Sequence, residues 1–287
     1  MVKKVTSIIL LIVLSSCKKE RVSQYSYSIA TAPTIKQNHI NPDGNTLKTR
    51  FYPPKGYKRD SLQKKTFGYF LQNYPLKEHG KQVQLFNGNL KNRQDVHAAI
   101  FDISVGKRDL QQCADATMRL RADYLYQQKI YDSIHFNFTN GFNAEYSKWR
   151  NGQRISVNGN KVSWYNGSSK SDSRTSFDKY LTMVFSYAGT LSLEKEMKKI
   201  NVEEIQIGDV FIQGGSPGHA VIVVDVAKNK EGKKLFLLAQ SYMPAQEIHV
   251  LKNFKNTNIS PWYDAENLQY LYTPEWNFTK NNLRRFN

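Results

Sequence analysis

Three polar residues that lie far apart in the chain have the side chains needed to cleave an amide bond: Cys113, His219 and Gln240. A thiolate is a strong nucleophile, but it needs a base that takes the thiol proton, and that base needs a polar group that orients its ring. His219 begins one valine-rich segment, and Gln240 ends the next apolar one. If these segments pair as a hairpin, the two side chains meet at one edge of a sheet, about 5–8 Å apart. We therefore expect Cys113 to be a nucleophile, His219 its base and Gln240 the orienting group.

Each of these residues also has an ordinary structural explanation. A histidine that follows a glycine is often a solvated turn residue. A cysteine on the apolar face of a helix often packs as a small apolar side chain. His97 and His249, each at or in an expected strand, are the alternative bases for Cys113.

Three short apolar segments predict the sheet that would carry the histidine. Val210–Ile212, Ala220–Val226 and Leu235–Ala239 are rich in valine, leucine and isoleucine and are separated by polar turns that contain glycine. Continuous apolar runs of this length are typical of strands buried on both faces. We expect the three to be neighbouring antiparallel strands, with the helix that carries Cys113 packed on them.

The cysteine lies at the start of a predicted helix. Asp109 is a favourable N-cap, and Gln112 follows it by three residues, as in a capping box. Cys113 would then lie in the first turn, where the free N–H groups and the helix dipole favour a thiolate.

The spacing of apolar residues predicts other helices over residues 61–74, 177–188 and 193–199, and strands over residues 46–57, 82–86 and 97–105.

The first residues are typical of an exported lipoprotein. Lys3 and Lys4 precede a short apolar stretch that ends in Leu14-Ser15-Ser16-Cys17. This ending resembles a lipobox, the site at which bacterial lipoproteins are cleaved and acylated on cysteine. The resemblance implies a signal peptide over residues 1–16 and a palmitate-type acyl anchor on Cys17, and more than one acyl chain holds a protein stably on a membrane. The polar residues 17–46 predict a flexible tether, and residues 47–287 a single globular domain.

Composition narrows the possible partners. The chain carries a formal net charge of +17, with 41 lysines and arginines against 24 acidic residues. A basic chain can bind nucleic acid or an anionic surface. The lysines are scattered and form no nucleic-acid motif, so we expect no nucleic acid partner and instead attraction to peptidoglycan or another anionic envelope polymer. The pattern predicts no cofactor and no metal, and it does not specify an oligomeric state.

Two resemblances extend beyond single residues. The segments R-D-L-Q-Q-C-A-D-A, G-D-V-F-I-Q-G-G-S-P-G-H-A-V-I-V-V-D and A-Q-S-Y-M-P-A-Q resemble a family of envelope lipoproteins of unknown function, over nearly the whole mature chain. Gln112-Cys113, Gly208-Asp209-Val210, Gly218-His219 and Gln240 resemble, more weakly, the corresponding positions of CHAP and NlpC/P60 peptidases and amidases of the cell wall. In that group the third residue is usually His, Asn or Glu, and the segment between cysteine and histidine is shorter.

The second resemblance implies a fold and a reaction. The fold would be α+β, a papain-like or NlpC-like core in which a central antiparallel sheet packs on the cysteine-bearing helix, with N-terminal and C-terminal extensions. The reaction would be thiol-dependent hydrolysis or transfer at an amide of cell-wall peptide, with an oxyanion held by the Cys113 N–H and the side chain of Gln111 or Gln112. We place the protein in the bacterial cell envelope and favour the outer membrane over the inner. The alternative is a non-catalytic binding or scaffold lipoprotein.

Overall fold

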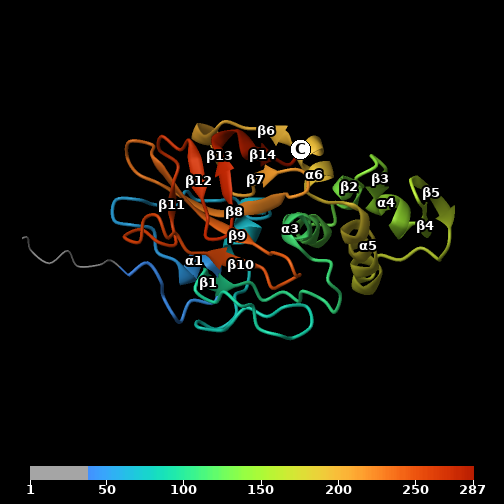
Figure 1. Ribbon diagram of the computed structural model, residues 1–287, viewed down its shortest axis with the longest axis horizontal. Helices are drawn as coiled ribbons and strands as arrows, with labels where there is room; N and C mark the ends of the chain where they lie inside the picture. The colour runs from blue at the N-terminus through green and yellow to red at the C-terminus, as the bar shows by residue number, and fades with distance from the viewer. Residues whose placement is uncertain (1–37) are drawn as a thin grey trace, which may run out of the picture. The chain divides into compact units, whose positions relative to one another are not determined.

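The central element of the structure is an eight-stranded antiparallel sheet (Figure 1). A computed structural model describes residues 38–287, so the predicted signal peptide, Cys17 and most of the predicted tether lie outside the described residues. The strands follow one another in the sheet in the order β1-β10-β9-β8-β7-β14-β6, and β11 also pairs with β9. Their bounds are β1 His97–Ile100, β6 Lys198–Lys199, β7 Val210–Gln213, β8 His219–Lys228, β9 Lys234–Gln240, β10 His249–Leu251, β11 Tyr263–Asp264 and β14 Leu283–Arg285.

The expected three-strand core is confirmed. Strands β7, β8 and β9 are consecutive and antiparallel, and Ile222 of β8 pairs with Val210 on one side and Ala239 on the other. The register shifts at a bulge between Val223 and Asp225. The strands are longer than predicted, because β8 begins at His219 and β9 ends at Gln240, so both candidate polar residues are strand residues rather than turn residues.

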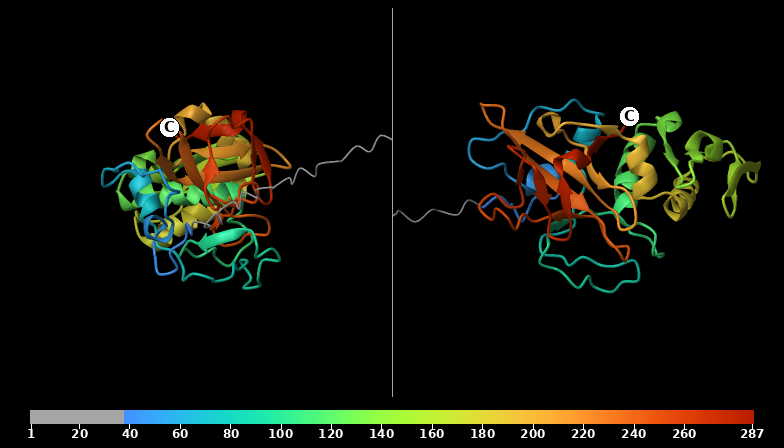
Figure 2. Two further views of the ribbon diagram at one scale, coloured as in Figure 1. Left: turned by 90° about the vertical axis from the view of Figure 1, so that its left-hand side faces the viewer. Right: turned by 45° about the horizontal axis from the view of Figure 1, so that its top comes forward.

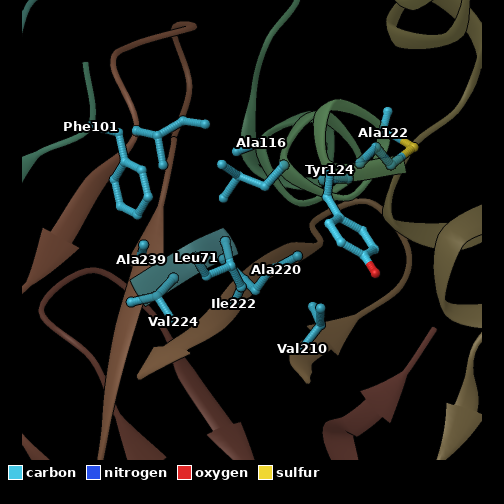
Figure 3. Close-up of a cluster of buried hydrophobic side chains, with 14 of the residues drawn as sticks. Leu71, Phe101, Ala116, Ala122, Tyr124, Val210, Ala220, Ile222, Val224 and Ala239 are labelled. Carbon is cyan, nitrogen blue, oxygen red and sulfur yellow. The ribbon is translucent and has the colours of Figure 1, made fainter. Parts of the chain in front are cut away.

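Strand β8 is buried on both faces, which explains its almost continuous apolar sequence. Ala220, Ile222 and Val224 contribute to the core under the helices, whereas Val221 and Val223 contribute to a second apolar cluster on the other face. Figure 3 shows the first of these clusters, with side chains of the cysteine-bearing helix directed at the strands. Each large apolar side chain buried in this way contributes about 1.5–3 kcal/mol.

The cysteine-bearing helix α3 spans Cys113–Gln127 and packs on the sheet, as predicted. Its predicted cap is wrong. Gln112, not Asp109, is the N-cap, and the Asp115 carboxylate accepts a hydrogen bond from the Gln112 N–H at 3.0 Å. Asp109 instead accepts from the Ala245 N–H at 2.6 Å. The capping motif is therefore displaced by three residues, and Cys113 becomes the first residue of the helix.

Other local predictions were partly right. The predicted strand over residues 46–57 is wrong, because Thr46 caps a short helix with its side chain. The predicted helix over residues 61–74 begins only after the cap Thr66.

The remaining helices are α1 Leu47–Arg50, α2 Phe67–Gln72, α4 Tyr146–Arg150, α5 Arg174–Tyr187 and α6 Thr190–Glu196, with short 3₁₀ turns η1 Tyr131–Ser133, η2 Val202–Glu204 and η3 Lys280–Asn282. None of the helices within residues 38–287 is long and apolar enough to cross a bilayer.

Three two-stranded hairpins complete the described chain. They are β2 His135–Asn137 with β3 Asn143–Glu145, β4 Gln153–Asn158 with β5 Lys161–Asn166, and β12 Tyr270–Tyr272 with β13 Asn277–Thr279. The β4–β5 hairpin lies beyond α4 and α5, on the side away from the sheet (Figures 1 and 2). The β12–β13 hairpin covers the second face of the sheet through Leu271 and Phe278. This last hairpin brings the C-terminal region next to His219.

Candidate active site and the family of the chain

His219 and Gln240 lie next to each other, as predicted. The His219 Nε2 is 2.8 Å from the Gln240 Oε1, and both side chains are buried. Aromatic rings enclose the imidazole on several sides. The centroid distances from it are 4.9 Å to Tyr242, 5.4 Å to Trp276 and 6.0 Å to Phe278. The histidine is therefore held in place by packing as well as by the glutamine.

The glutamine is oriented by a buried ion pair. The Gln240 Nε2 donates to the Glu275 Oε2 at 2.7 Å, and the Glu275 Oε1 accepts from the Lys91 Nζ at 2.6 Å. Since a carboxylate only accepts, the Gln240 amide nitrogen must face Glu275 and its oxygen must face the imidazole. The His219 Nε2 therefore carries the proton, and Nδ1 keeps a lone pair. This is the tautomer that a general base requires.

The Cys113 sulfur lies beside the peptide groups on either side of His219. Its Sγ is 4.0 Å from the Gly218 carbonyl oxygen, and the Ala220 backbone N–H also favours its charged form. Among the described residues, this carbonyl is the hydrogen-bond contact of the thiol, and no hydrogen bond joins the thiol to the imidazole. An approach of the sulfur to within about 4 Å of the ring, or about 6 Å in the resting state, stays a prediction.

Strand geometry explains this separation. Side chains alternate along β8, so His219 shares a face with Val221 and the β13 residue Phe278, whereas Cys113 belongs to the helix on the other face. The contact of Cys113 with this strand is with the Gly218 carbonyl oxygen, at the end of the sheet where β8 begins. Tyr242 lies at this corner, since its ring contacts His219. Burial raises the pKa of Tyr242, with smaller contributions from Glu275 and Cys113.

The electrostatics differ from the sequence-based expectation. Burial, with a smaller contribution from Asp115, raises the pKa of the Cys113 thiol to about 11. Burial also lowers the pKa of His219 to about 4, although Gln240 opposes this shift. The favourable helix N-terminus is thus outweighed by desolvation, because the sulfur is largely removed from water. At neutral pH the site contains a neutral thiol and a neutral imidazole, not the expected thiolate.

The thiol borders a cavity of about 320 Å³ between the start of α3, the end of α5 and the loop before β8. Gln112 lines this cavity and donates through Nε2 to Asp109 at 3.1 Å. Gln111 lines a different hollow, where its Oε1 accepts from Arg119. Only one of the two predicted oxyanion donors therefore borders the same space as the sulfur. His219 does not border this cavity, so the thiol is the one candidate nucleophile or base in its wall. Three larger hollows, of about 690, 670 and 660 Å³, have neither a thiol nor a histidine in their walls.

The alternative histidines lie together on neighbouring strands. The rings of His97 and His249 are 6.2 Å apart, and neither residue borders the Cys113 cavity. His249 is held through Nδ1 by the Glu247 carbonyl oxygen, and burial lowers its pKa to about 3. Within residues 38–287, no three His, Cys, Asp or Glu side chains are grouped so that they could hold a metal ion.

Sequence reasoning missed most of the residues that support the histidine. Lys91 lies in a polar loop with no recognisable pattern, and Glu275 is an isolated acid in the aromatic C-terminal region. Tyr242 lies two residues after Gln240, the last residue of β9. Because side chains alternate along an extended strand, this spacing puts Tyr242 on the same side as Gln240, and it was the one local signal that could have placed the ring beside the imidazole.

The family of the chain is defined by comparison with known proteins. A family model described as "Domain of unknown function (4846)" matches residues 47–285, so the chain belongs to that family. No curated protein and no solved structure matches the chain. The fold is thus an α+β arrangement with a central antiparallel sheet packed against helices, in a family whose description names no activity.

Proposed function

We propose that this protein is a thiol-dependent hydrolase or transferase that acts on an amide bond of cell-wall peptide, with Cys113 as nucleophile. The observation that carries the proposal is the oriented imidazole. Gln240 and Glu275 hold His219 in the tautomer that leaves Nδ1 as a proton acceptor, next to the strand end where the thiol lies.

The proposed reaction starts from the neutral pair. As the sulfur attacks the amide carbonyl carbon, the thiol proton passes to His219 Nδ1, so the thiolate forms only in the transition state. The Cys113 N–H and the Gln112 side chain are the donors that we assign to the developing oxyanion. The C–N bond then breaks, the imidazolium gives its proton to the leaving amine, and a thioester remains on Cys113. Water, or a second amine, attacks that thioester and regenerates the thiol.

The substrate and location follow from the N-terminal sequence and the charge. The full chain has a net charge of +17, and removal of residues 1–16, which contain Lys3 and Lys4, leaves +15. A lipidated protein of this charge would stay at the membrane, close to anionic envelope polymers. The order of Cys113, His219 and Gln240 and their positions on a helix start and two neighbouring strands support a papain-like arrangement of the CHAP or NlpC/P60 type. We expect Cys17→Ala to abolish acylation and to change membrane partition, and an unaltered mass and partition would disprove the anchor.

Purified cell-wall peptide gives the direct test. The unaltered protein should release new amine and carboxyl ends, and Cys113→Ser and His219→Gln should each lose this activity. Ser216→Ala, which alters the cavity wall but none of the proposed groups, is the matched control and should keep it. Cleavage that persists in Cys113→Ser would rule out the thiol as nucleophile.

A scaffold role is the second candidate, and one observation favours it. The thiol is largely buried and its pKa is raised to about 11, as expected for a cysteine that only packs. In that case neither variant would affect any reaction, and the protein would bind envelope polymers without altering them. An activated acyl ester separates the two roles, because only a nucleophilic Cys113 forms a stable adduct of the acyl mass.

A further inference from the structure

The hollow of about 670 Å³ contains none of the groups of the proposed reaction, and its wall is rich in aromatic side chains. It lies between α2, the end of α3 and the start of α5. Four half-buried aromatic residues line it: Tyr69, Phe70, Tyr74 and Tyr126. Three of them pack on other rings, as in the Phe70–Tyr74 contact at 5.3 Å and the Tyr126–Phe177 contact at 4.2 Å. Within residues 38–287, Tyr69 packs on no other aromatic ring, so its ring is available to stack on a ligand.

The same wall carries polar groups that the rest of the protein does not use. Among the described residues, no hydrogen bond reaches the hydroxyl groups of Tyr69 and Tyr74 or the side-chain amides of Gln127 and Gln128. These groups are not sealed from solvent, so a ligand can reach them. A small number of polar groups beside aromatic surface is typical of a small-molecule site.

The charges of the wall favour a neutral or anionic ligand. The Asp123 carboxylate is already paired, with its Oδ2 2.7 Å from the Arg119 Nε and its Oδ1 2.9 Å from the Arg174 Nη1. Lys64 and Lys65 are exposed at the same hollow, and neither forms an ion pair within the described part of the chain. Since the unpaired charges are both positive, a cationic ligand would be repelled.

The secondary structure of the wall separates the remaining ligand classes. Only helices and loops contribute to it, so it offers no strand edge on which an extended peptide could pair. A sugar has apolar C–H faces that stack on an aromatic ring, and hydroxyl groups at its edge that need donors and acceptors. We infer that this hollow binds a sugar unit of a neutral or acidic glycan, with the Tyr69 ring as platform and Tyr74 and Gln127 as hydrogen-bond partners. The sugar site goes beyond the proposed function and does not depend on Cys113.

The position of the sugar site along α3 sets its distance from the thiol. Asp123 and Gln127 lie 10 and 14 residues after Cys113, which corresponds to about 15–21 Å along the helix. Helix α5 lies beside α3 (Figure 1), and a hollow between them shares Leu110 and Phe185 with the Cys113 cavity. An extended peptide covers this distance with about five residues. A peptide attached to the bound sugar would therefore reach the thiol, and this last step rests on the proposed function.

Isothermal titration calorimetry with tri-N-acetylchitotriose, a neutral sugar trimer, tests the site without any turnover. The unaltered protein should bind the trimer, and Tyr69→Ala should bind it at least about tenfold more weakly, the loss of about 1.4 kcal/mol. Tyr69→Phe keeps the ring and should lose less. Tyr270→Ala is the matched control, because Tyr270 is 61% exposed on the β12–β13 hairpin, away from the hollow, and it should bind as the unaltered protein does.

Three results would overturn the sugar site. They are no binding of the trimer to the unaltered protein at millimolar concentrations, equal binding by Tyr69→Ala, and binding of tetraalanine in place of the trimer, which would make the hollow a peptide site. Cleavage assays keep this outcome apart from the proposed function. If the trimer binds and no cell-wall peptide is cleaved, the sugar site stands and the proposed function fails. If peptide is cleaved and the trimer does not bind, the proposed function stands and the sugar site fails.

Discussion

The buried ion pair behind Gln240 should be a large and measurable contributor to stability. The Lys91 and Glu275 side chains are 7% and 9% exposed, and their charged atoms are 2.6 Å apart. Removing one partner of such a pair leaves an uncompensated buried charge, which costs about 3–5 kcal/mol. We therefore expect Glu275→Gln to lower the free energy of unfolding by about that amount. Lys91→Met combined with Glu275→Gln should lose less than the two single variants together.

Urea denaturation of the four proteins gives the coupling energy from a double-mutant cycle. The expected value is at least about 2 kcal/mol. The chain contains a matched control, because Arg93 and Asp95 form an ion pair of similar length, 2.8 Å, whose side chains are 47% and 59% exposed. An exposed pair of this kind couples by less than about 1 kcal/mol. Equal coupling energies in the two cycles would show that burial does not give the Lys91–Glu275 pair its strength.

The same variant also tests the positioning role of Glu275. A glutamine at 275 can both donate and accept, so the Gln240 amide would no longer have a single preferred orientation. The ring nitrogens of His219, observed by ¹⁵N NMR, should change from one tautomer, with the proton on Nε2, to a mixture. A purely structural ion pair would change stability and leave the tautomer as it was. An unchanged tautomer would therefore refute the reasoning on which the proposed base depends.

Two further predictions follow from the buried charges. The folded pKa of His219, about 4, lies below its ordinary value of 6.5, so the stability it contributes is complete above pH 6.5 and is lost as the pH falls through 4. Between pH 7 and pH 4, the free energy of unfolding measured with urea should fall by about 3 kcal/mol more in the unaltered protein than in His219→Phe. Parallel pH profiles of the two proteins would contradict this prediction. At pH 7.5 the Cys113 thiol, with a pKa of about 11 against an ordinary 9.0, should react with iodoacetamide about 100-fold more slowly than an exposed thiol. A rate that levels off near pH 9 would show that the thiol is not desolvated.

Some parts of the candidate site were predictable because they depend on local patterns. The apolar runs and polar turns between residues 210 and 239 predict three antiparallel strands, and a hairpin necessarily brings the start of one strand near the end of the next. The contact between His219 and Gln240 follows from that topology alone. The placement of Cys113 at a helix start is also a local property, which the cap residues indicate even though the sequence suggested Asp109 and the structure has Gln112.

What the sequence by itself determined is therefore the strand order around β8, the helix that packs on it and the identity of the candidate residues. The tertiary structure decided the chemical state of those residues. Lys91 and Glu275 are separated by 184 positions in the chain, so no local pattern can show that they meet. The face of the sheet on which His219 lies and the solvent exposure of the Cys113 thiol both depend on every element packed around them. A pKa responds to that whole environment, which is why the expected thiolate of Cys113 became a buried thiol.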